Sequence, residues 1–320
     1  MRKMMAIAII FFLGAITLIT SVNLAEAQKK KFISIATAGT GGTHYIVGAG
    51  MAKVINKYVP GMKASSESTA GIIENIKLAG TKKITLAFGA SGENYFAYKG
   101  EKMFKERYEG VRFVMGGYSQ DQHIMARADS PIKSIDDLRG KKVALGAPGS
   151  GTAGTAIATL ETVGLKQGVD YKPEWLSFVE VVQGLKDGTI DAGFITGSSP
   201  LSAIVDLTTS HAIRFLPLTK ASQLKLEPMF FYPGKILKGS YKGLNEDVPC
   251  VSNLINLITH KDIDGEIVYA VVKALHEHNK ELVEVHPGGK DWNLENGLRG
   301  MTIPLHPALE KYYREKGLLK

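Results

Sequence analysis

The stretch "TAGTGGTHYIVG", residues 37–48, joins an apolar run to a helical pattern through a turn rich in glycine and threonine. The residues before it, "FISIATA" (32–38), predict a β-strand, and "YIVGAGMAKVINKYV" (45–59) carries apolar residues at helical spacing. A turn with so little side-chain bulk lets a ligand approach the backbone closely. It could serve a nucleotide phosphate, a catalytic nucleophile, or a ligand that is bound and released unchanged.

Short apolar runs alternate with helical patterns along most of the chain, which is typical of an α/β protein with parallel strands. The pattern predicts further strands at 63–69, 84–90, 111–118, 123–128, 141–147, 174–178 and 191–196, with a return strand in "MFFYP" (229–233). It predicts helices at 72–80, 148–165, 179–190 and 265–283.

The order of these elements predicts two lobes with a cleft between them. One α/β series is followed by a second series and then by a mixed tail, and 320 residues suffice for two domains of ordinary size. We expect residues 28–119 to form the first part of lobe 1 and residues 120–221 to form lobe 2. Residues 222–320 then return to lobe 1 and add C-terminal helices.

The N-terminus has the pattern of a secretory signal peptide. Two basic residues precede the apolar run "MMAIAIIFFLGAITLI" (4–19), and "LAEA" (24–27) supplies small residues at the −3 and −1 positions. We expect residues 1–27 to be removed by cleavage after Ala27. A retained membrane anchor is disfavoured because a polar stretch and the cleavage site end the run. The pattern therefore predicts export to the periplasm.

Composition adds two constraints. The formal charge is +8, but the lysines are scattered and no arginine-rich or aromatic-basic stripe appears, so the sequence does not favour nucleic-acid binding. The single cysteine, Cys250, cannot form an internal disulfide, so core packing must stabilise the fold.

Nucleotide-binding motifs are incomplete. "GAPGSGT" (146–152) has the glycine spacing of a P-loop, but Thr152 stands where the phosphate-binding lysine is needed. "GSGTAG" (149–154) matches G-x-G-x-x-G, yet the acidic residue at a suitable distance, Asp170, precedes the next predicted strand instead of following it. In the opening turn, His44 takes the place of the third glycine.

Catalytic motifs are also incomplete. Ser150 is flanked by glycines at ±1, whereas the nucleophile elbow G-x-S-x-G needs them at ±2. His276 and His278 are two residues apart on a predicted helix, so they point to different faces. We therefore expect no enzymatic activity, no metal site and no cofactor. The alternatives are a secreted enzyme acting on a small organic acid, which turnover would reveal, and a periplasmic sensor.

A ligand-binding role needs less specialised chemistry. In an open α/β lobe, helix N-termini follow the strand ends, and their first N–H groups lack partners and favour anions. Two comparable turns, "GTGGTHY" (39–45) and "APGSGT" (147–152), lie in the first and second series, and "STAGIIENI" (68–76) is a third candidate. One turn from each lobe could bind a small carboxylate between them.

The chain resembles the TAXI family of solute receptors, which serve tripartite ATP-independent periplasmic (TRAP) transporters. The resemblance covers most of the chain up to residue 222 and is carried by the stretches at 32–61, 68–79, 136–156 and 184–200. It implies an α/β, two-lobed periplasmic-binding-protein fold of type II, with a ligand in the interlobe cleft that is enclosed by hinge closure. It also implies a glutamate-like amino acid or another organic acid as ligand, and delivery to a TRAP-type membrane permease.

Two family motifs are altered here. The family loop T-G-G-T-Y-Y corresponds to residues 40–45, with His44 in place of the first aromatic residue and Tyr45 retaining the second. In the family's S-x-G-G-S-x-x-N stretch, Ile72 replaces a hydroxyl residue, which favours a less polar acid. The G-S-G-T turn is intact at 149–152, and no arginine falls within the matched motifs.

These observations together predict the site. Arg127 is a lesser candidate for the carboxylate, and the protein is expected to be a monomer that does not bind nucleic acid. The expected ligand-binding residues are Gly42, Thr43, His44, Tyr45, Thr69, Ser91, Ser150, Gly151, Thr152 and Thr196.

Overall fold

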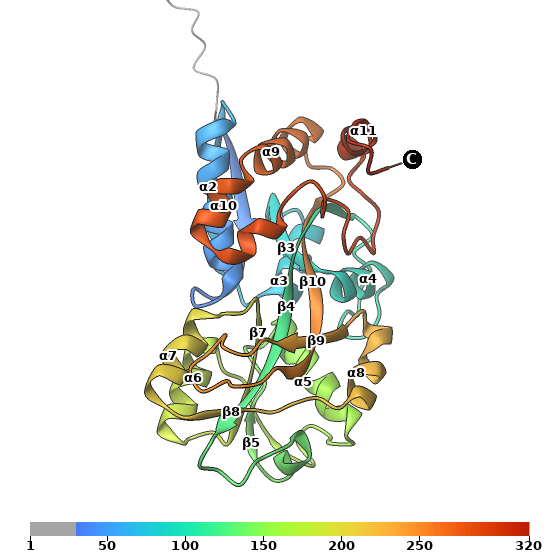
Figure 1. Ribbon diagram of the computed structural model, residues 1–320. Helices are drawn as coiled ribbons and strands as arrows, with labels where there is room; N and C mark the ends of the chain where they lie inside the picture. Colours follow the sequence, from blue (N-terminus) through green and yellow to red (C-terminus); the bar gives the residue numbers. More distant parts are fainter. Residues whose placement is uncertain (1–29, 320) are drawn as a thin grey trace, which may run out of the picture.

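The computed structural model describes residues 30–319, coloured along the chain in Figure 1. The predicted signal peptide and its cleavage site lie outside these residues. Within residues 30–319, no helix combines the length and apolarity that a membrane span requires.

A ten-stranded sheet runs through both halves of the molecule in the order β2-β1-β3-β10-β4-β7-β5-β6, with β8 paired to β4 and β9 to β10. Strands β1, β2 and β3 are parallel, as are β5, β6 and β7, whereas β10 and β4 are antiparallel to their neighbours. The strands are β1 (Lys31–Ala36), β2 (Met62–Glu67), β3 (Leu86–Ala90), β4 (Val111–Arg127), β5 (Lys142–Ala144), β6 (Lys172–Glu174), β7 (Ala192–Gly197), β8 (Ile213–Phe215), β9 (Tyr232–Ile236) and β10 (Val248–His260).

Helices follow most of the parallel strands and cover the sheet (Figure 1). They are α2 (Thr43–Tyr58), α3 (Ile72–Gly80), α4 (Ser91–Lys99), α5 (Gly151–Thr162), α6 (Phe178–Asp187), α7 (Ser202–Ser210), α8 (Lys220–Leu226), α9 (Gly265–Glu277), α10 (Asn279–Val285) and α11 (Glu310–Glu315). Short 3-10 turns are η1 (Ile135–Leu138), η2 (Glu227–Met229), η3 (Pro287–Asp291) and η4 (Pro307–Leu309).

The molecule has two lobes, each with its own core. In the first lobe, one apolar cluster joins β1, β2, β3 and the first part of β4 to helices α2, α3, α9 and α11. In the second lobe, two clusters lie on the two faces of the sheet, one under α5 and α8 and the other under α6 and α7. Two α/β lobes were expected from the sequence, and this prediction is confirmed.

Strands β4 and β10 cross from one lobe to the other (Figure 1). Strand β4 pairs with β10 from Val111 to Asp121 and then with β7 from Asp121 to Ala126. Strand β10 pairs with β9 in the second lobe and with β3 in the first. These two paired strands therefore connect the lobes.

The expectation of two separate strands at 111–118 and 123–128 is wrong, because both belong to β4. The polar residues between them interrupt the apolar pattern, yet Gln120 pairs in register with Asn253 and Asp121 with Ser252. They lie where the strand passes between the two cores. Their polarity therefore marks the crossing and not a break in the strand.

Strand β10 was not predicted from the sequence. The segment before it contacts both lobes, because Leu226, Phe231, Val248 and Cys250 pack in the cores of the second lobe, whereas Phe230 packs against Tyr95 and Phe96 of the first. Strand β10 then carries the chain into the first lobe.

Two further expectations are corrected at the ends of helices. The expected strand at 174–178 is β6 followed by a loop, since Ser177 caps α6 in a capping box with Glu180. The expected helix at 265–283 is two helices, α9 and α10, which meet at His278. There the ring of His278 stacks on Tyr58, and Asn279 Nδ2 donates to carbonyl oxygens of the loop at 289–292.

Candidate functional site

A cavity of about 270 Å³ lies between the lobes. The first lobe contributes residues 38–44 and 68–72 to its wall. The second lobe contributes Ala147, the first residues of α5 with their Ser150 cap, residues 177–179 and Thr196. Gln120 of β4 lines it at the crossing between the lobes. The wall is therefore built mainly from the loops that follow parallel strands.

Four helices begin at this wall: α2 and α3 from the first lobe, and α5 and α6 from the second. The N-caps of α2 and α3 are Gly42 and Gly71, and neither helix has a side-chain cap. Helices α2 and α5 carry no acidic residue in the first turn. Since the first N–H groups of a helix lack internal partners, these helix starts favour an anion.

Two buried hydroxyl groups on the wall have no hydrogen-bond partner within residues 30–319. They are Thr43 Oγ1, at the first position of α2, and Thr196 Oγ1, at the end of β7. The exposed fractions of the two residues are only 3% and 6%. Buried polar groups are nearly always paired in folded proteins, so one unpaired hydroxyl from each lobe is strong support for a bound polar ligand.

Eight of the ten predicted site residues line this cavity: Gly42, Thr43, His44, Thr69, Ser150, Gly151, Thr152 and Thr196. Three of them make internal side-chain hydrogen bonds: His44, which is described below, and Ser150 and Thr69. Ser150 Oγ accepts from Ala153 N and donates to Ala147 O, so this hydroxyl caps α5. The Thr69 hydroxyl lies 2.7 Å from Asn75 Oδ1 and accepts from Gly71 N, which shapes the turn before α3.

The other two predicted residues, Tyr45 and Ser91, and the lesser candidate Arg127 do not lie on the wall. Tyr45 is absent from it, one position after His44 on α2. The hydroxyl of Ser91 donates to Gly300 O at 2.8 Å, which fixes the start of α4 to the C-terminal segment. Arg127, the lesser candidate for the carboxylate, is paired with Asp129 and also donates to Lys186 O at the far end of α6.

His44 is a neutral part of the wall. It packs against Phe88 in a stacked arrangement, and its Nδ1 lies 2.5 Å from Tyr118 OH. Burial lowers the pKa of His44 to about 4 and raises the pKa of the Tyr118 hydroxyl well above its ordinary value. Within residues 30–319, His44 is the hydrogen-bond partner of this hydroxyl, so we assign the hydroxyl as donor to Nδ1. The ring proton is then on Nε2.

The two lobes touch each other around the cavity. A Cβ atom placed on Gly71 would lie 3.5 Å from Ser150 Cα, and one placed on Gly42 would lie 3.6 Å from the ring of Phe178. Gly71 has a φ of 123°, a conformation that residues with a side chain rarely adopt. The turn before α3 therefore needs glycine for its backbone angle, whereas a Cβ there would make only an ordinary contact with the second lobe.

Two buried carboxyl groups lie near the wall without forming part of it. Glu93 on α4 is 4% exposed, accepts a hydrogen bond from Asn253 Nδ2, and lies beside Gly151. Burial raises its pKa, and the hydrogen bond from Asn253 opposes this effect. Asp121 accepts hydrogen bonds from Ser252 and Ser199, and burial raises its pKa as well.

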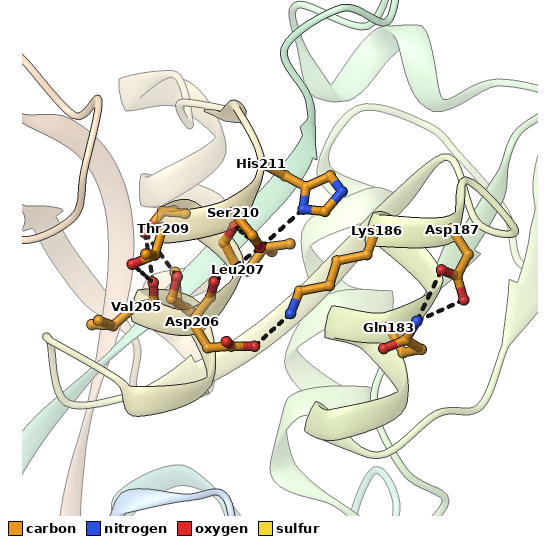
Figure 2. Close-up of polar contacts among 11 residues, drawn as sticks. Gln183, Lys186, Asp187, Val205, Asp206, Leu207, Thr209, Ser210 and His211 are labelled. Carbon is orange, nitrogen blue, oxygen red and sulfur yellow. Dashed lines mark hydrogen bonds and ion pairs between the residues drawn. The ribbon is translucent and has the colours of Figure 1, made fainter.

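An ion pair joins α6 to α7 at the end of α6 that lies away from the cavity. Lys186 Nζ lies 2.6 Å from Asp206 Oδ2 on α7, and within α6 Gln183 Nε2 donates to Asp187 one turn later (Figure 2). Phe178, the first residue of α6, lines the cavity.

A serine–histidine contact exists away from this wall. His123 Nε2 lies 3.0 Å from Ser199 Oγ and 3.0 Å from Tyr241 OH, while its Nδ1 faces backbone oxygens. The Asp121 carboxylate contacts Ser199 and not the histidine ring, which differs from the order of a catalytic triad. Within residues 30–319, no group of three or more His, Cys, Asp or Glu side chains could hold a metal ion.

Two residues of the wall, Gln120 and Phe178, were not predicted from the sequence. Gln120 lies in the polar crossing of β4, which was assigned to a gap between strands. Phe178 was placed at the end of a strand, although the pair Ser177 and Glu180 is a capping-box signal for a helix that begins there. This signal could have placed Phe178 and Val179 at a helix start beside the cleft.

The family model of the NMT1-like family matches residues 35–317. The chain belongs to the NMT1-like family. The solved structure of a periplasmic transporter has 14% sequence identity, covers 89% of this NMT1-like chain and 92% of its own chain, and gives a TM-score of 0.54.

Two further solved structures give a similar result. A protein from Bordetella bronchiseptica is 16% identical, with 91% of this chain and 89% of its own covered and a TM-score of 0.52. A Xanthomonas citri protein bound to ATP is 11% identical, with 89% and 94% covered and a TM-score of 0.50. At such identities the likeness concerns the fold alone. This NMT1-like chain therefore has the two-lobed fold of periplasmic binding proteins.

Proposed function

We propose that this protein is a periplasmic solute receptor that binds a small carboxylate between its lobes and delivers it to a TRAP-type membrane permease. The observation that carries the proposal is the pair of buried, unpartnered hydroxyls, Thr43 Oγ1 and Thr196 Oγ1, which face one cavity from opposite lobes. Each can donate to the ligand, and the starts of α2, α3 and α5 provide further N–H donors beside them.

Binding would be coupled to rotation about the hinge of β4 and β10. The ligand contacts both lobes only when they are together, so it stabilises the closed form by its differential affinity for that form. The wall supports this mechanism, because α2 and α3 belong to one lobe whereas α5 and α6 belong to the other. The closed surface is then what a permease would recognise.

The first experiment measures binding directly. The protein is unfolded and refolded to remove bound ligand, and then titrated calorimetrically with organic acids, their amides, and amino acids. Specific binding of an acid, together with a rise in the unfolding temperature, would support the proposal, since ligand at a thousand times its Kd adds about 4 kcal/mol of stability. If no acid binds to correctly refolded protein, the proposed function is wrong.

A second experiment tests the permease partner. Vesicles that contain a TRAP-type permease from the same cell are incubated with the receptor and the radiolabelled acid in the external solution. Uptake that requires the receptor supports delivery, whereas binding without receptor-dependent uptake contradicts that part of the proposal and favours a sensor.

A further inference from the structure

The cavity wall is unusual for a site that binds an amino acid, because the residues that the structure describes place no charged side chain on it. It contains no aspartate, glutamate, lysine or arginine, and its single titratable side chain within residues 30–319 is His44. Burial lowers the pKa of His44 to about 4, so this side chain is neutral at physiological pH. Recognition of charge must therefore come from backbone N–H groups, helix ends and neutral side chains.

Such a wall treats the two charges of an amino acid differently. A carboxylate meets the starts of α2, α3 and α5 and the donor hydroxyls of Thr43 and Thr196. An ammonium group meets only neutral acceptors. Burying a charged group without an opposite charge costs several kcal/mol, even when neutral hydrogen bonds remain.

The nearby acids lie outside the wall, and each accepts hydrogen bonds from neutral donors of the protein. Glu74 accepts from Ala70 N at the start of α3, and Glu180 accepts from Ser177 N at the start of α6. Glu93 accepts from Asn253, and Asp121 accepts from Ser252 at 2.6 Å. Within the described part of the chain, the wall itself therefore presents no carboxylate side chain to an ammonium group.

The rest of the wall includes neutral polar side chains but presents mainly apolar surface, which comes from both lobes. Ile72 lies at the start of α3, and Phe178 and Val179 form the start of α6. Alanines at 38, 70 and 147 complete this surface. The cavity volume of about 270 Å³ lies at the lower end of the range of roughly 300–1,000 Å³ for small-molecule sites, which favours a compact ligand.

We propose that the ligand is a carboxylic acid without an ammonium group, in which the carboxylate is joined to a compact apolar body such as a branched aliphatic chain or a single aromatic ring. This inference rests on the proposed function and narrows its ligand class. The carboxylate faces the helix starts and the two threonine hydroxyls, and the apolar body packs against Ile72 and Phe178. A 2-oxo acid also fits, because its keto oxygen accepts from neutral donors.

The test uses ligands that share a skeleton and differ in one group. Refolded protein is titrated with 4-methyl-2-oxopentanoate, leucine and 4-methyl-2-oxopentanamide, and with 3-phenylpropionate, phenylalanine and 3-phenylpropanamide. The inference predicts that at least one acid binds and that its amino-acid partner binds at least 100-fold more weakly. Amino acids that bind as tightly as the acids would overturn the inference but leave the receptor function intact.

Two other outcomes would overturn the carboxylate assignment or the apolar-acid class. Amides that bind as tightly as the acids would overturn both the carboxylate and this inference. No binding by either acid, or binding by glutamate alone in a wider amino-acid series, would overturn the apolar-acid class.

A variant provides an independent check. Gln120→Glu changes one wall residue to a carboxylate of the same size at the hinge end of the cavity. This variant should weaken binding of the acid at least tenfold and reduce the difference in affinity between the acid and the amino acid. Gln122→Glu, on the same strand but not on the wall, is the matched control, and calorimetric unfolding verifies that both variants fold. If Gln120→Glu leaves the preference unchanged, the neutral wall does not determine the ligand class.

Discussion

Replacing Thr43 or Thr196 by valine tests whether their hydroxyls serve the ligand or the fold. Valine has the same shape as threonine and lacks the hydroxyl. A hydrogen bond to a charged group contributes about 1.5–3 kcal/mol, so each variant should weaken carboxylate binding by roughly 10- to 150-fold.

The same variants should not lose stability in the absence of ligand, although they bind the carboxylate more weakly. A buried hydroxyl without a protein partner carries a desolvation penalty of about 1–3 kcal/mol, which valine removes. We therefore expect the free energy of unfolding without ligand to stay the same or to rise in both variants. A hydroxyl that stabilised the fold would instead make its valine variant less stable.

The matched control is Thr155→Val on α5. This threonine is 3% exposed, donates to Gly151 O at 2.9 Å and does not lie on the wall. Its loss should reduce stability by about 1 kcal/mol and leave affinity unchanged. Calorimetric unfolding and titration measure both quantities for all three variants. Valine variants that bind the acid as tightly as the parent would refute the assignment of Thr43 and Thr196.

Three further predictions concern titration and backbone strain. His44 is neutral in the fold with a pKa of about 4, whereas unfolded histidine titrates near 6.5, so stability is lost as the pH falls from 6.5 to 4. Between pH 7 and 5, His44→Gln should reduce this loss by about 2 kcal/mol in urea unfolding, and an unchanged pH slope would contradict the burial of His44. Glu93 has a raised pKa, so the folded state loses stability as the pH rises above 4.5. Glu93→Gln should therefore raise the unfolding temperature at pH 7, and this gain should disappear below pH 4.5. A lower unfolding temperature of the variant at pH 7 would show that the charge of Glu93 is stabilising. Gly71→Ala forces a side chain into a φ of 123° and should cost about 1–3 kcal/mol in chemical unfolding, whereas Gly140→Ala, with a φ of 76° and open space around it, should cost less.

The sequence predicts the local elements well where one rule dominates. Helix α3 occupies the expected residues 72–80, because a clear amphipathic pattern is bounded by Gly71 and by a terminal glycine. The turns at Thr43 and Thr152 were found because glycine and hydroxyl residues follow a strand and open a helix. Both turns reach the cavity for the reason that motivated the prediction, since each starts a helix at the C-terminal end of a parallel strand.

Positions that depend on long-range geometry could not be predicted in this way. Ser91 also follows a strand and opens a helix, but its hydroxyl is taken up by Gly300 O, more than two hundred residues away. Gln120 lies in a polar segment that resembles a loop until β10 pairs with it. Whether a residue at the end of a strand faces the cavity therefore depends on which distant segment of the chain packs over it. The local sequence pattern does not reveal that segment.

The glycines of the opening stretch can now be explained by what each one faces. A side chain on Gly48 would clash with Thr37 and meet Phe88, so this glycine brings α2 close to β1. Gly42 faces the ring of Phe178 from the other lobe, and it leaves the start of α2 without a side-chain cap. Gly48 thus serves packing within a lobe. At Gly42 the tighter constraint comes from its own turn, because a Cβ would lie 3.3 Å from Gly39 O and at an ordinary contact distance of 3.6 Å from Phe178. Without a side-chain cap at Gly42, the first N–H groups of α2 remain available to a ligand, which is what the proposed receptor role needs.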